Sequence, residues 1–342
     1  MSNILKGNDR IHVGFWSPYL KSQRGNSTTA KRIVSGLRAE GFLVEVFAYN
    51  EDDWDEQAEE RMSSCDLYHI LHFDRFANWV EKSNFHINRP YLVTSGGTDV
   101  NEKMTHAISR NLLLNANAIS VFTKEAAHKV IATYPSASDK IHIIPQSIYV
   151  PQEVRKLEQP LPKGYPKVLL PAGLREVKDI FYVFDALLSL RTKYPSLQLM
   201  IVGEAIESHV EDKVHKYKGE YPWFHYGGSI PLEEMVDMYK WADVVLNTSK
   251  SEGQPIALME AMYHQVPVIA RQNAGNESLI QQGYNGFLFQ ETDAFETHFI
   301  ELIENSRLNE SIVLNGHAII KQCYSIQTEI ENYKRIYEKM MR

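Results

Sequence analysis

The chain has 342 residues, of which 44% are hydrophobic and 23% charged, and its formal net charge is −7. This length and hydrophobic content predict two domains, each with a core of its own. The acidic balance gives no basis for sequence-independent nucleic-acid binding, which requires basic patches.

Secretion, membrane insertion and metal binding find little support in the sequence. The two cysteines, Cys65 and Cys323, lie far apart and suggest no disulfide framework, which fits a reducing compartment. The first ten residues lack the apolar core of a signal peptide, and no run approaches the roughly 18–20 apolar residues of a membrane span. The thirteen histidines show no recognisable metal spacing. We therefore expect a cytoplasmic protein with no metal and no cofactor.

Residues 1–150 show short apolar strands that alternate with helical stretches. The strands are expected at residues 11–16, 43–48, 67–71, 91–94, 118–122 and 141–144. The helices are expected at residues 30–41, 54–62, 76–82, 102–115 and 124–133. This alternation predicts a doubly wound, Rossmann-like parallel sheet with helices on its faces.

Residues 151–166 are rich in proline and charge, which indicates a linker. A second α/β series fills residues 167–320, and a C-terminal helix over residues 321–342 is expected to pack back toward the first domain. Strands of the second series are expected at residues 167–171, 197–202, 223–226, 244–247, 266–270 and 286–289, and helices at 180–194, 232–241 and 277–282. Two successive domains of this class predict a ligand site in the cleft that they face.

The segment Ser251–Met262 is the strongest candidate for a site. It places Glu252 before a predicted helix and Glu260 just over one turn inside it. Pro255 suits the first turn, where its missing N–H costs nothing. The free N–H groups and the dipole of a helix N-terminus favour an anion such as a diphosphate. Taken alone, an amphipathic helix with an acidic cap explains the same pattern.

The segment Pro171–Asp179 follows the first strand of the second domain, where a doubly wound sheet presents its ligand-facing loops. Arg175 and Lys178 are a suitable pair for phosphate oxygens. Asp179 is expected to cap the following helix. Two surface cations in weak salt bridges are an equally good interpretation of this segment alone.

Two loops of the first domain are candidates for binding the second substrate. In one, Gly97, Thr98 and Asp99 lie between a strand and a helix. Glycine lets the backbone approach a ligand closely, and Asp99 either binds sugar hydroxyls or caps the next helix. In the other loop, Gly25 and Asn26 either face a ligand or simply start a helix.

Fingerprints of other enzyme classes are absent from the sequence. No G-x-G-x-x-G follows the first strand of either domain, and there is no Walker-type loop. The G-x-S-x-G elbow of the Ser/His/Asp hydrolases is also missing.

The linked motifs of the second domain resemble the donor-binding core of the retaining GT-B glycosyltransferases of family 4. These motifs are Ala242–Ser249, Ser251–Met262, Val266–Ala270, Ala274–Glu277 and Gly283–Leu288. The resemblance covers nearly the whole chain, and the pattern is most similar to the branch of glycosyltransferase 1 domain-containing proteins. It implies the GT-B architecture of two Rossmann-like domains.

The resemblance also implies roles for individual residues. Glu260 would hold the ribose, Glu252 would face the donor sugar, and Arg175 with Lys178 would neutralise the diphosphate. The backbone of Gly253, Gln254, Pro255, Ile256 and Ala257 would surround the sugar and diphosphate, and Gly228 and Ile230 would lie against the nucleobase. Arg175 and Lys178 are closer in sequence than is usual for the family, and Gln254-Pro255 replaces a common aromatic–glycine pair.

The expected function is therefore transfer of a sugar, with retention, from a nucleotide-diphosphate sugar, with a UDP-sugar expected first. The acceptor is open: a glycan, a lipid-linked compound or a small molecule. Two alternatives remain, a GT-B-like sugar-nucleotide epimerase or phosphorylase, and a sugar-nucleotide-binding protein without turnover.

Overall fold

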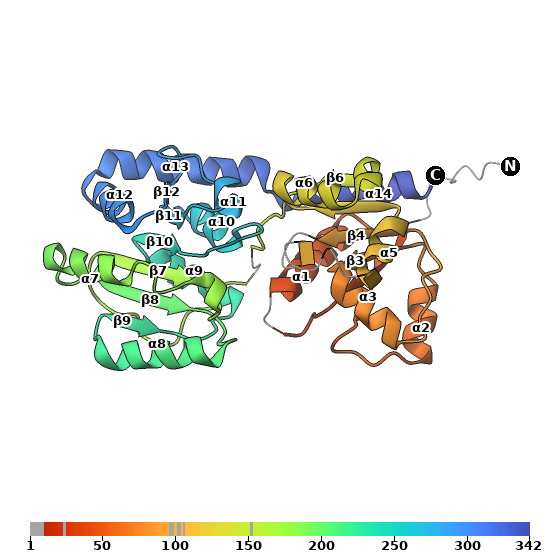
Figure 1. Cartoon of the computed structure of the whole chain (residues 1–342), viewed down its shortest axis with the longest axis horizontal. Coiled ribbons are helices and arrows are strands. Elements are labelled where there is room, and N and C mark those ends of the chain that lie inside the picture. The colour runs from red at the N-terminus through yellow and green to blue at the C-terminus, as the bar shows by residue number, and fades with distance from the viewer. Residues whose placement is uncertain (1–9, 23–24, 96–98, 101–103, 105–106, 151–152) are drawn as a thin grey trace. The chain divides into compact units, whose positions relative to one another are not determined.

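The chain folds into two compact units, and each is built on a parallel β-sheet (Figure 1). The computed structural model describes all residues except 1–9, 23–24, 96–98, 101–103, 105–106 and 151–152. Unit 1 comprises Met1–Tyr149 and Tyr324–Arg342, and unit 2 comprises Val150–Cys323. The chain thus leaves unit 1 once and returns to it with its last helix.

Unit 1 contains a six-stranded sheet in the order β2-β1-β3-β4-β5-β6, and every strand pair is parallel. Its strands are β1 (His12–Ser17), β2 (Leu43–Ala48), β3 (Leu67–Leu71), β4 (Tyr91–Ser95), β5 (Ala118–Val121) and β6 (Ile141–Ile143). Its helices are α1 (Gly25–Ala39), α2 (Glu56–Ser63), α3 (Phe73–Lys82), α5 (Ala107–Asn115), α6 (Lys124–Thr133), the 3-10 helix η1 (Pro135–Lys140) and α14 (Ile326–Met340).

Both faces of the unit 1 sheet are packed. On one face, Trp16 lies at the centre of an aromatic cluster with Phe47, Trp54 and Phe85. On the other face, α1 and α14 cover the sheet, and the buried Tyr333 and Tyr337 of α14 lie in this second core. Burial on both faces explains why the strands are continuous apolar runs rather than alternating ones.

Unit 2 contains a six-stranded sheet in the order β12-β11-β10-β7-β8-β9, again with parallel pairs. Its strands are β7 (Lys167–Pro171), β8 (Gln198–Val202), β9 (Phe224–Tyr226), β10 (Val244–Asn247), β11 (Val268–Arg271) and β12 (Phe287–Phe289). Its helices are η2 (Glu176–Lys178), α7 (Phe184–Lys193), α8 (Ser208–Glu220), α9 (Leu232–Trp241), α10 (Ile256–Tyr263), α11 (Ala274–Glu277), α12 (Thr292–Glu304) and α13 (Ser306–Cys323).

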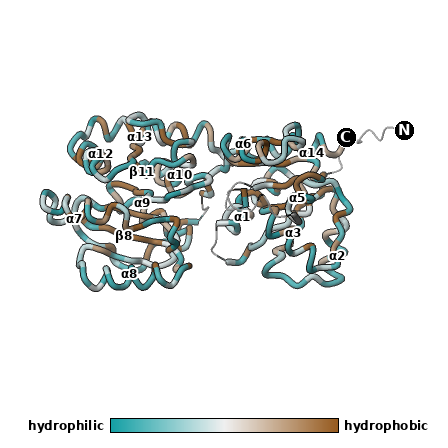
Figure 2. Tube along the Cα trace, viewed as in Figure 1, coloured by the Kyte–Doolittle hydropathy of each residue, from teal (hydrophilic) through white to brown (hydrophobic). Residues whose placement is uncertain are grey.

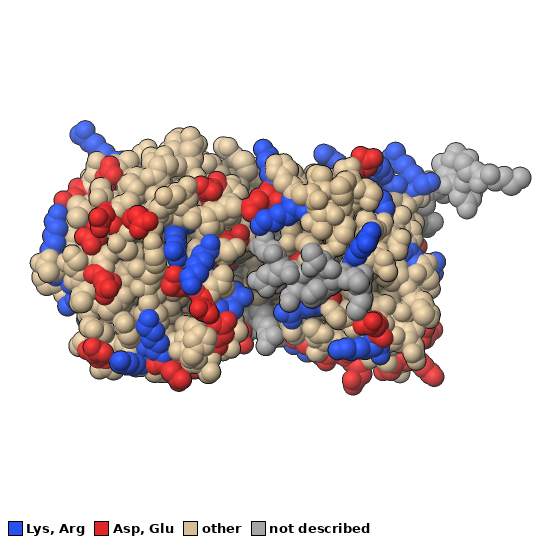
Figure 3. All heavy atoms as spheres, viewed as in Figure 1, with Lys and Arg blue, Asp and Glu red and all other residues tan. Residues whose placement is uncertain are grey.

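The hydropathy of the chain follows these layers. In Figure 2, β8 is strongly hydrophobic, whereas α8 is mostly hydrophilic. Only Val214 of α8 is buried, as expected for a helix that covers a sheet with one narrow stripe. On the face shown in Figure 3, acidic and basic side chains are interspersed over each unit. No helix among the described residues is both long and apolar enough to span a bilayer.

Several expected helix boundaries are wrong: α1 begins at Gly25 rather than at residue 30, α3 begins at Phe73 rather than at residue 76, and two helices of unit 2 also differ. The helix expected from residue 180 begins only at Phe184, because Asp179 adopts a left-handed backbone conformation (φ 42°) and a turn follows it. Asp179 therefore does not cap α7; its carboxylate binds Arg271 instead, at 2.8 Å. The helix expected at residues 277–282 is α11, which starts at Ala274 because the Asn273 side chain accepts the N–H of Asn276.

Candidate functional site

The candidate site of unit 2 lies at the switch point of its sheet. The chain enters the sheet at β7 and builds outward in both directions, so the order reverses between β7 and β10. In open α/β sheets, ligands bind beyond the carboxyl ends of the strands at such a point. Lys178 follows β7 and Glu252 follows β10, and the Lys178 Nζ lies 2.5 Å from the Glu252 Oε1. The sheet topology therefore brings together two residues that the sequence separates by 74 positions.

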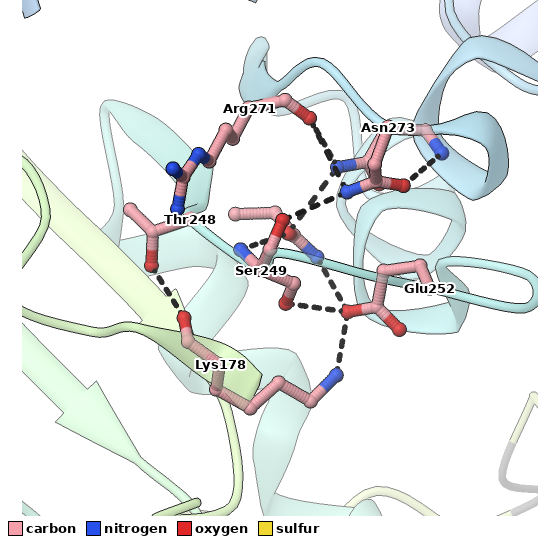
Figure 4. A network of polar contacts seen from close by, with 8 residues as sticks. Lys178, Thr248, Ser249, Glu252, Arg271 and Asn273 are labelled. Atoms are coloured by element: carbon pink, nitrogen blue, oxygen red, sulfur yellow. Dashed lines mark hydrogen bonds and ion pairs between the residues drawn. The ribbon is translucent and has the colours of Figure 1, made fainter. Parts of the chain in front are cut away.

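The Glu252 carboxylate is held by three donors. Besides Lys178, its Oε1 accepts hydrogen bonds from Ser249 Oγ at 2.7 Å and from Asn247 Nδ2 at 3.1 Å (Figure 4). Burial alone would raise the pKa of Glu252, but the charge of Lys178 and these hydrogen bonds outweigh burial and hold the pKa below that of an ordinary glutamate. Glu252 is therefore an ionised, oriented carboxylate at neutral pH, which suits hydrogen bonding to hydroxyls better than proton donation.

A chain of asparagines supports the Glu252 loop. The Asn247 Oδ1 accepts the N–H of Ser249, and Asn273 Nδ2 donates to the carbonyl of Ser249 at 2.8 Å (Figure 4). Asn276, which is fully buried, donates to the Arg271 carbonyl at 2.8 Å and to Asn247 Oδ1 at 3.3 Å. These amides are not among the residues predicted from the sequence, although polar side chains at the ends of buried parallel strands are a signal for such a scaffold.

Gly275 lets the start of α11 approach this loop. A Cβ at position 275 would lie 2.5 Å from the carbonyl oxygen of Glu252 and 2.6 Å from its Cβ. Real Cβ atoms do not come this close to backbone atoms, so any larger residue would displace the Glu252 loop. Glycine is thus required here by close approach rather than by backbone conformation.

The cations of the site differ in how they are paired. Arg271 is paired with Asp179 and lies over the ring of Tyr182, 3.6 Å from its centroid. Lys178 is paired with Glu252, but an ammonium has three N–H donors and can bind a second acceptor. Arg175 begins the turn that contains Lys178, and within the described part of the chain its side chain has no counter-ion and its buried Nε has no hydrogen bond. An anion would satisfy this guanidinium.

Helix α10 follows the Glu252 loop and carries Glu260. Pro255 is its N-cap, and Glu260 lies on its second turn, half-buried. The phenol of Tyr239, on α9, donates to Glu260 Oε2 at 2.6 Å. Tyr239 was not among the residues expected at the site, because it comes from a different helix.

The remaining donor-side residues lie on loops at the same edge of the sheet. Gly253, Gln254, Ile256 and Ala257 are half-buried and Pro255 is buried, between β10 and the first turn of α10. Gly228 has a left-handed backbone conformation (φ 71°), and its carbonyl accepts the N–H of Gly203, which follows the neighbouring strand β8. The half-buried Ile230 follows in the same loop.

The residues expected on the acceptor side belong to unit 1. The switch point of its sheet lies between β1 and β3, and α1, which follows β1, starts with the exposed Gly25 and the half-buried Asn26. Asp99 is buried; it accepts from Ser95 Oγ at 2.5 Å and lies 3.7 Å from Nδ1 of His72, which directly follows β3. Gly97 and Thr98 lie outside the described residues.

One group of described residues has metal-ligand geometry. Ligand atoms of Glu176, Glu207 and His209 all lie within 4.8 Å of one another. The carboxylate of Glu207 already accepts the N–H of Glu176 at 2.8 Å, and both Glu176 and His209 are exposed to solvent. Exposed acidic groups are common without an ion, so we assign no metal to this group.

Comparison with known families and proteins points to sugar transfer. Residues 152–318 match the family described as "Glycosyl transferases group 1". The chain is 27% identical over 339 residues to glycosyltransferase 1 domain-containing protein 1 of Xenopus tropicalis, covering 93% of this chain and 95% of that protein. It is 23% identical over 273 residues to alpha-monoglucosyldiacylglycerol synthase of Acholeplasma laidlawii, covering 77% of this chain and 66% of that protein.

Solved structures share the fold over nearly the whole chain. Anabaena HepE, solved in complex with UDP and glucose, has a TM-score of 0.76 and 16% identity, and the match covers 96% of this chain and 100% of HepE. The sucrose-phosphate synthase of Thermosynechococcus elongatus has a TM-score of 0.73 and 16% identity, covering 97% of this chain and 99% of the synthase. At this identity, the likeness shows the fold.

Proposed function

We propose that this glycosyltransferase, whose residues 152–318 match the group 1 glycosyl transferases and whose fold is GT-B, transfers a sugar from a UDP-sugar with retention of the anomeric configuration. The donor proposal is supported by HepE, whose structures contain UDP with glucose, or UDP-glucose. The acceptor remains a glycan, a lipid-linked compound or a small molecule.

The observation that carries this proposal is the charge arrangement at the switch point of unit 2. Arg175 has no counter-ion among the described residues, Lys178 has donors to spare, and Glu252 is ionised and oriented beside them. A nucleotide sugar has the complementary chemistry, because its diphosphate is anionic and its sugar carries hydroxyls. We assign the diphosphate to Arg175 and Lys178, and the sugar hydroxyls to Glu252.

The other residues of the site complete the donor assignment. Glu260 is assigned to the ribose hydroxyls, and the backbone from Gly253 to Ala257, at the start of α10, to the sugar and diphosphate. The loop of Gly228 and Ile230 is assigned to the nucleobase. On the acceptor side we keep Gly25 and Asn26, which follow β1, and Asp99, which lies beside His72 after β3; β1 and β3 flank the switch point of unit 1.

The proposed mechanism depends on stabilising the leaving group. As the bond between the anomeric carbon and the diphosphate breaks, negative charge develops on the phosphate oxygens, and Arg175 and Lys178 stabilise it. The acceptor hydroxyl attacks the same face of the sugar, and its proton passes to the leaving phosphate. This route requires neither a covalent enzyme intermediate nor a metal, because the two cations supply the charge stabilisation.

The two cysteines, which form no disulfide, support our placing the enzyme in the cytoplasm.

Slow hydrolysis of UDP-α-glucose tests this proposal without knowledge of the acceptor, since water can replace it. Proton NMR, recorded before the anomers equilibrate, should show UDP and α-glucose as the first products. β-Glucose as the first product would contradict retention. A changed sugar that is still attached to UDP would identify an epimerase, and sugar phosphate formed only with added phosphate would identify a phosphorylase. Binding of UDP-glucose without any product would identify a non-catalytic protein.

A further inference from the structure

The contact between Tyr239 and Glu260 links two helices of unit 2. Tyr239 lies in the last turn of α9 and is 2% exposed, and its hydroxyl lies 2.6 Å from Glu260 Oε2 on α10. The same hydroxyl lies 3.4 Å from the carbonyl of Ala257 on the first turn of α10. The buried phenol of Tyr239 therefore contacts both the first turn of α10 and the carboxylate of Glu260.

The direction of this hydrogen bond follows from the protonation of the phenol. Burial, followed by the negative charge of Glu260, raises the pKa of Tyr239 well above its usual value, so the hydroxyl keeps its proton and donates it. A donor at this distance from a carboxylate makes a strong, charge-assisted hydrogen bond. Glu260 Oε2 is thus committed to Tyr239, which fixes the orientation of the carboxylate plane.

Tyr239 is itself held rigidly. Its ring stacks on His264, with ring centroids 5.3 Å apart and planes inclined by 15°. Three hydrogen bonds join α9 to the linker segment of residues 155–162. Arg155 N–H donates to the Glu233 carbonyl, Leu157 N–H donates to Asp237, and Trp241 Nε1 donates to the Pro162 carbonyl. The same helix starts directly after the loop of Gly228 and Ile230, which we assigned to the nucleobase.

We propose that Tyr239 is a positioning residue that orients Glu260 toward the ribose and thereby gives the site its preference for ribonucleotides over deoxyribonucleotides. This inference rests on the proposed function, which assigns Glu260 to the ribose hydroxyls. Tyr239 itself does not contact the nucleotide in this account. Tyr239 acts through the Glu260 carboxylate. Because α9 also starts directly after the nucleobase loop, the same helix supports recognition of both the base and the ribose.

Calorimetric titration of the full chain with UDP and with 2′,3′-dideoxy-UDP tests the inference. The wild type should bind UDP about tenfold or more tightly than the dideoxy nucleotide, because the hydroxyls bind an ionised group. Tyr239→Phe keeps the ring and its stacking. It should weaken UDP binding about fivefold or more and leave binding of the dideoxy nucleotide within about twofold. Tyr194→Phe is the matched control, because the Tyr194 hydroxyl also donates to a glutamate, Glu304, and should change neither affinity.

A double variant separates positioning from packing. If Tyr239 acts through Glu260, then Glu260→Gln with Tyr239→Phe should bind UDP no more weakly than Glu260→Gln alone. Equal weakening of both nucleotides by Tyr239→Phe, or additive losses in the double variant, would overturn the inference while leaving the proposed function intact. If the wild type binds both nucleotides equally, the assignment of Glu260 to the ribose is wrong. If it binds neither nucleotide, the UDP donor is wrong. Either result would also contradict the proposed role of Tyr239.

Discussion

At the scale of residues, the site is defined by how its charges are compensated. Glu252 receives a cation and two neutral donors on one oxygen, whereas Arg175 has no partner among the described side chains. A buried donor without a partner is costly, so the unpaired Nε of Arg175 supports our assignment of an anionic ligand to this arginine. The catalytic burden in our account therefore falls on the cations.

Removing either cation should slow turnover. Lys178→Ala or Arg175→Ala should lower the rate of UDP release from UDP-glucose by roughly 10²-fold or more, as expected when a preorganised charge stabiliser is lost. The matched control is Lys193→Ala, which breaks an exposed ion pair with Glu304 in the same unit and should leave the rate unchanged. Near wild-type rates in both site variants would refute the assignment of the diphosphate.

The pKa of Glu252 predicts how stability depends on pH. Because the pKa is lower in the folded chain than in the unfolded one, the ionised carboxylate contributes stability that is fully present above about pH 4.5 and is lost as the pH falls through the folded value. The melting temperature of the wild type should exceed that of Glu252→Gln at about pH 7. This difference should shrink toward about pH 3.5, and a constant difference over that range would contradict the assignment.

The sequence predicted candidate site residues but not the contacts that orient them. Glu252, Glu260, Arg175 and Lys178 were identified from motifs whose residues are close in sequence. The contacts that orient them join positions far apart: Lys178 and Glu252 are separated by 74 positions, Arg271 and Asp179 by 92, and Tyr239 and Glu260 by 21. The strand order brings Lys178 to Glu252 and Asp179 to Arg271, and no local sequence signal indicates that order.

At the scale of elements, the start of α11 and the loop before α10 act as one piece. Asn273 caps α11 and also holds the Ser249 carbonyl, and Gly275 packs against the backbone of Glu252. A change in α11 therefore reaches Glu252 directly.

Gly275→Ala should displace the Glu252 loop. Its Cβ would lie 2.5 Å from a carbonyl oxygen, so the backbone must shift, which typically costs about 1–3 kcal/mol in a well-packed region. Urea unfolding should show this loss, and UDP-glucose binding should weaken with it. Gly219→Ala, in helix α8 with nothing within 4 Å of the added Cβ, is the matched control and should be neutral or slightly stabilising. A Gly275→Ala variant as stable and as tight-binding as the control would contradict this packing argument.

Most elements were predictable because their signals are local. The strand Leu67–Leu71, the helix Leu232–Trp241 and the strand Val244–Asn247 have the expected bounds, since each is an apolar run or an amphipathic stretch with clear ends. The start of α7 was not predictable, because Asp179 leaves the helical conformation and binds a distant arginine. Periodicity does not detect such a tertiary contact.

At the scale of the whole molecule, a buried ion pair fixes the return of the chain to unit 1. Arg32 on α1 and Glu329 on α14 make two hydrogen bonds, at 2.9 and 3.0 Å, and both side chains are almost completely buried. Glu329 also accepts the N–H and the hydroxyl of Ser147, shortly before the chain leaves unit 1. One carboxylate thus holds both the departing and the returning segments of the chain.

Glu329→Gln should destabilise unit 1 strongly, because it leaves the buried Arg32 without a counter-ion. Breaking a buried pair in this way costs about 3–5 kcal/mol. Glu331→Gln on the same helix breaks only an exposed pair with Arg335 and should cost less than about 1 kcal/mol. Unfolding can be followed by tryptophan fluorescence, to which unit 1 contributes Trp16, Trp54 and Trp79 and unit 2 contributes Trp223 and Trp241. Equal stability of the two variants would show that the ion pair does not hold α14 in place.

The central claim is that unit 2 binds a nucleotide-diphosphate sugar through Arg175, Lys178, Glu252 and Glu260. A thermal-shift measurement with UDP-, GDP- and ADP-glucose tests it most directly, because a ligand that binds only the native state raises the melting temperature. At 100 times its dissociation constant the ligand adds about 2.7 kcal/mol, which corresponds to roughly 5–10 °C for a domain of this size. We predict that UDP-glucose gives the largest shift and that Arg175→Ala reduces it. A wild-type chain that none of the three nucleotide sugars stabilises would contradict the account.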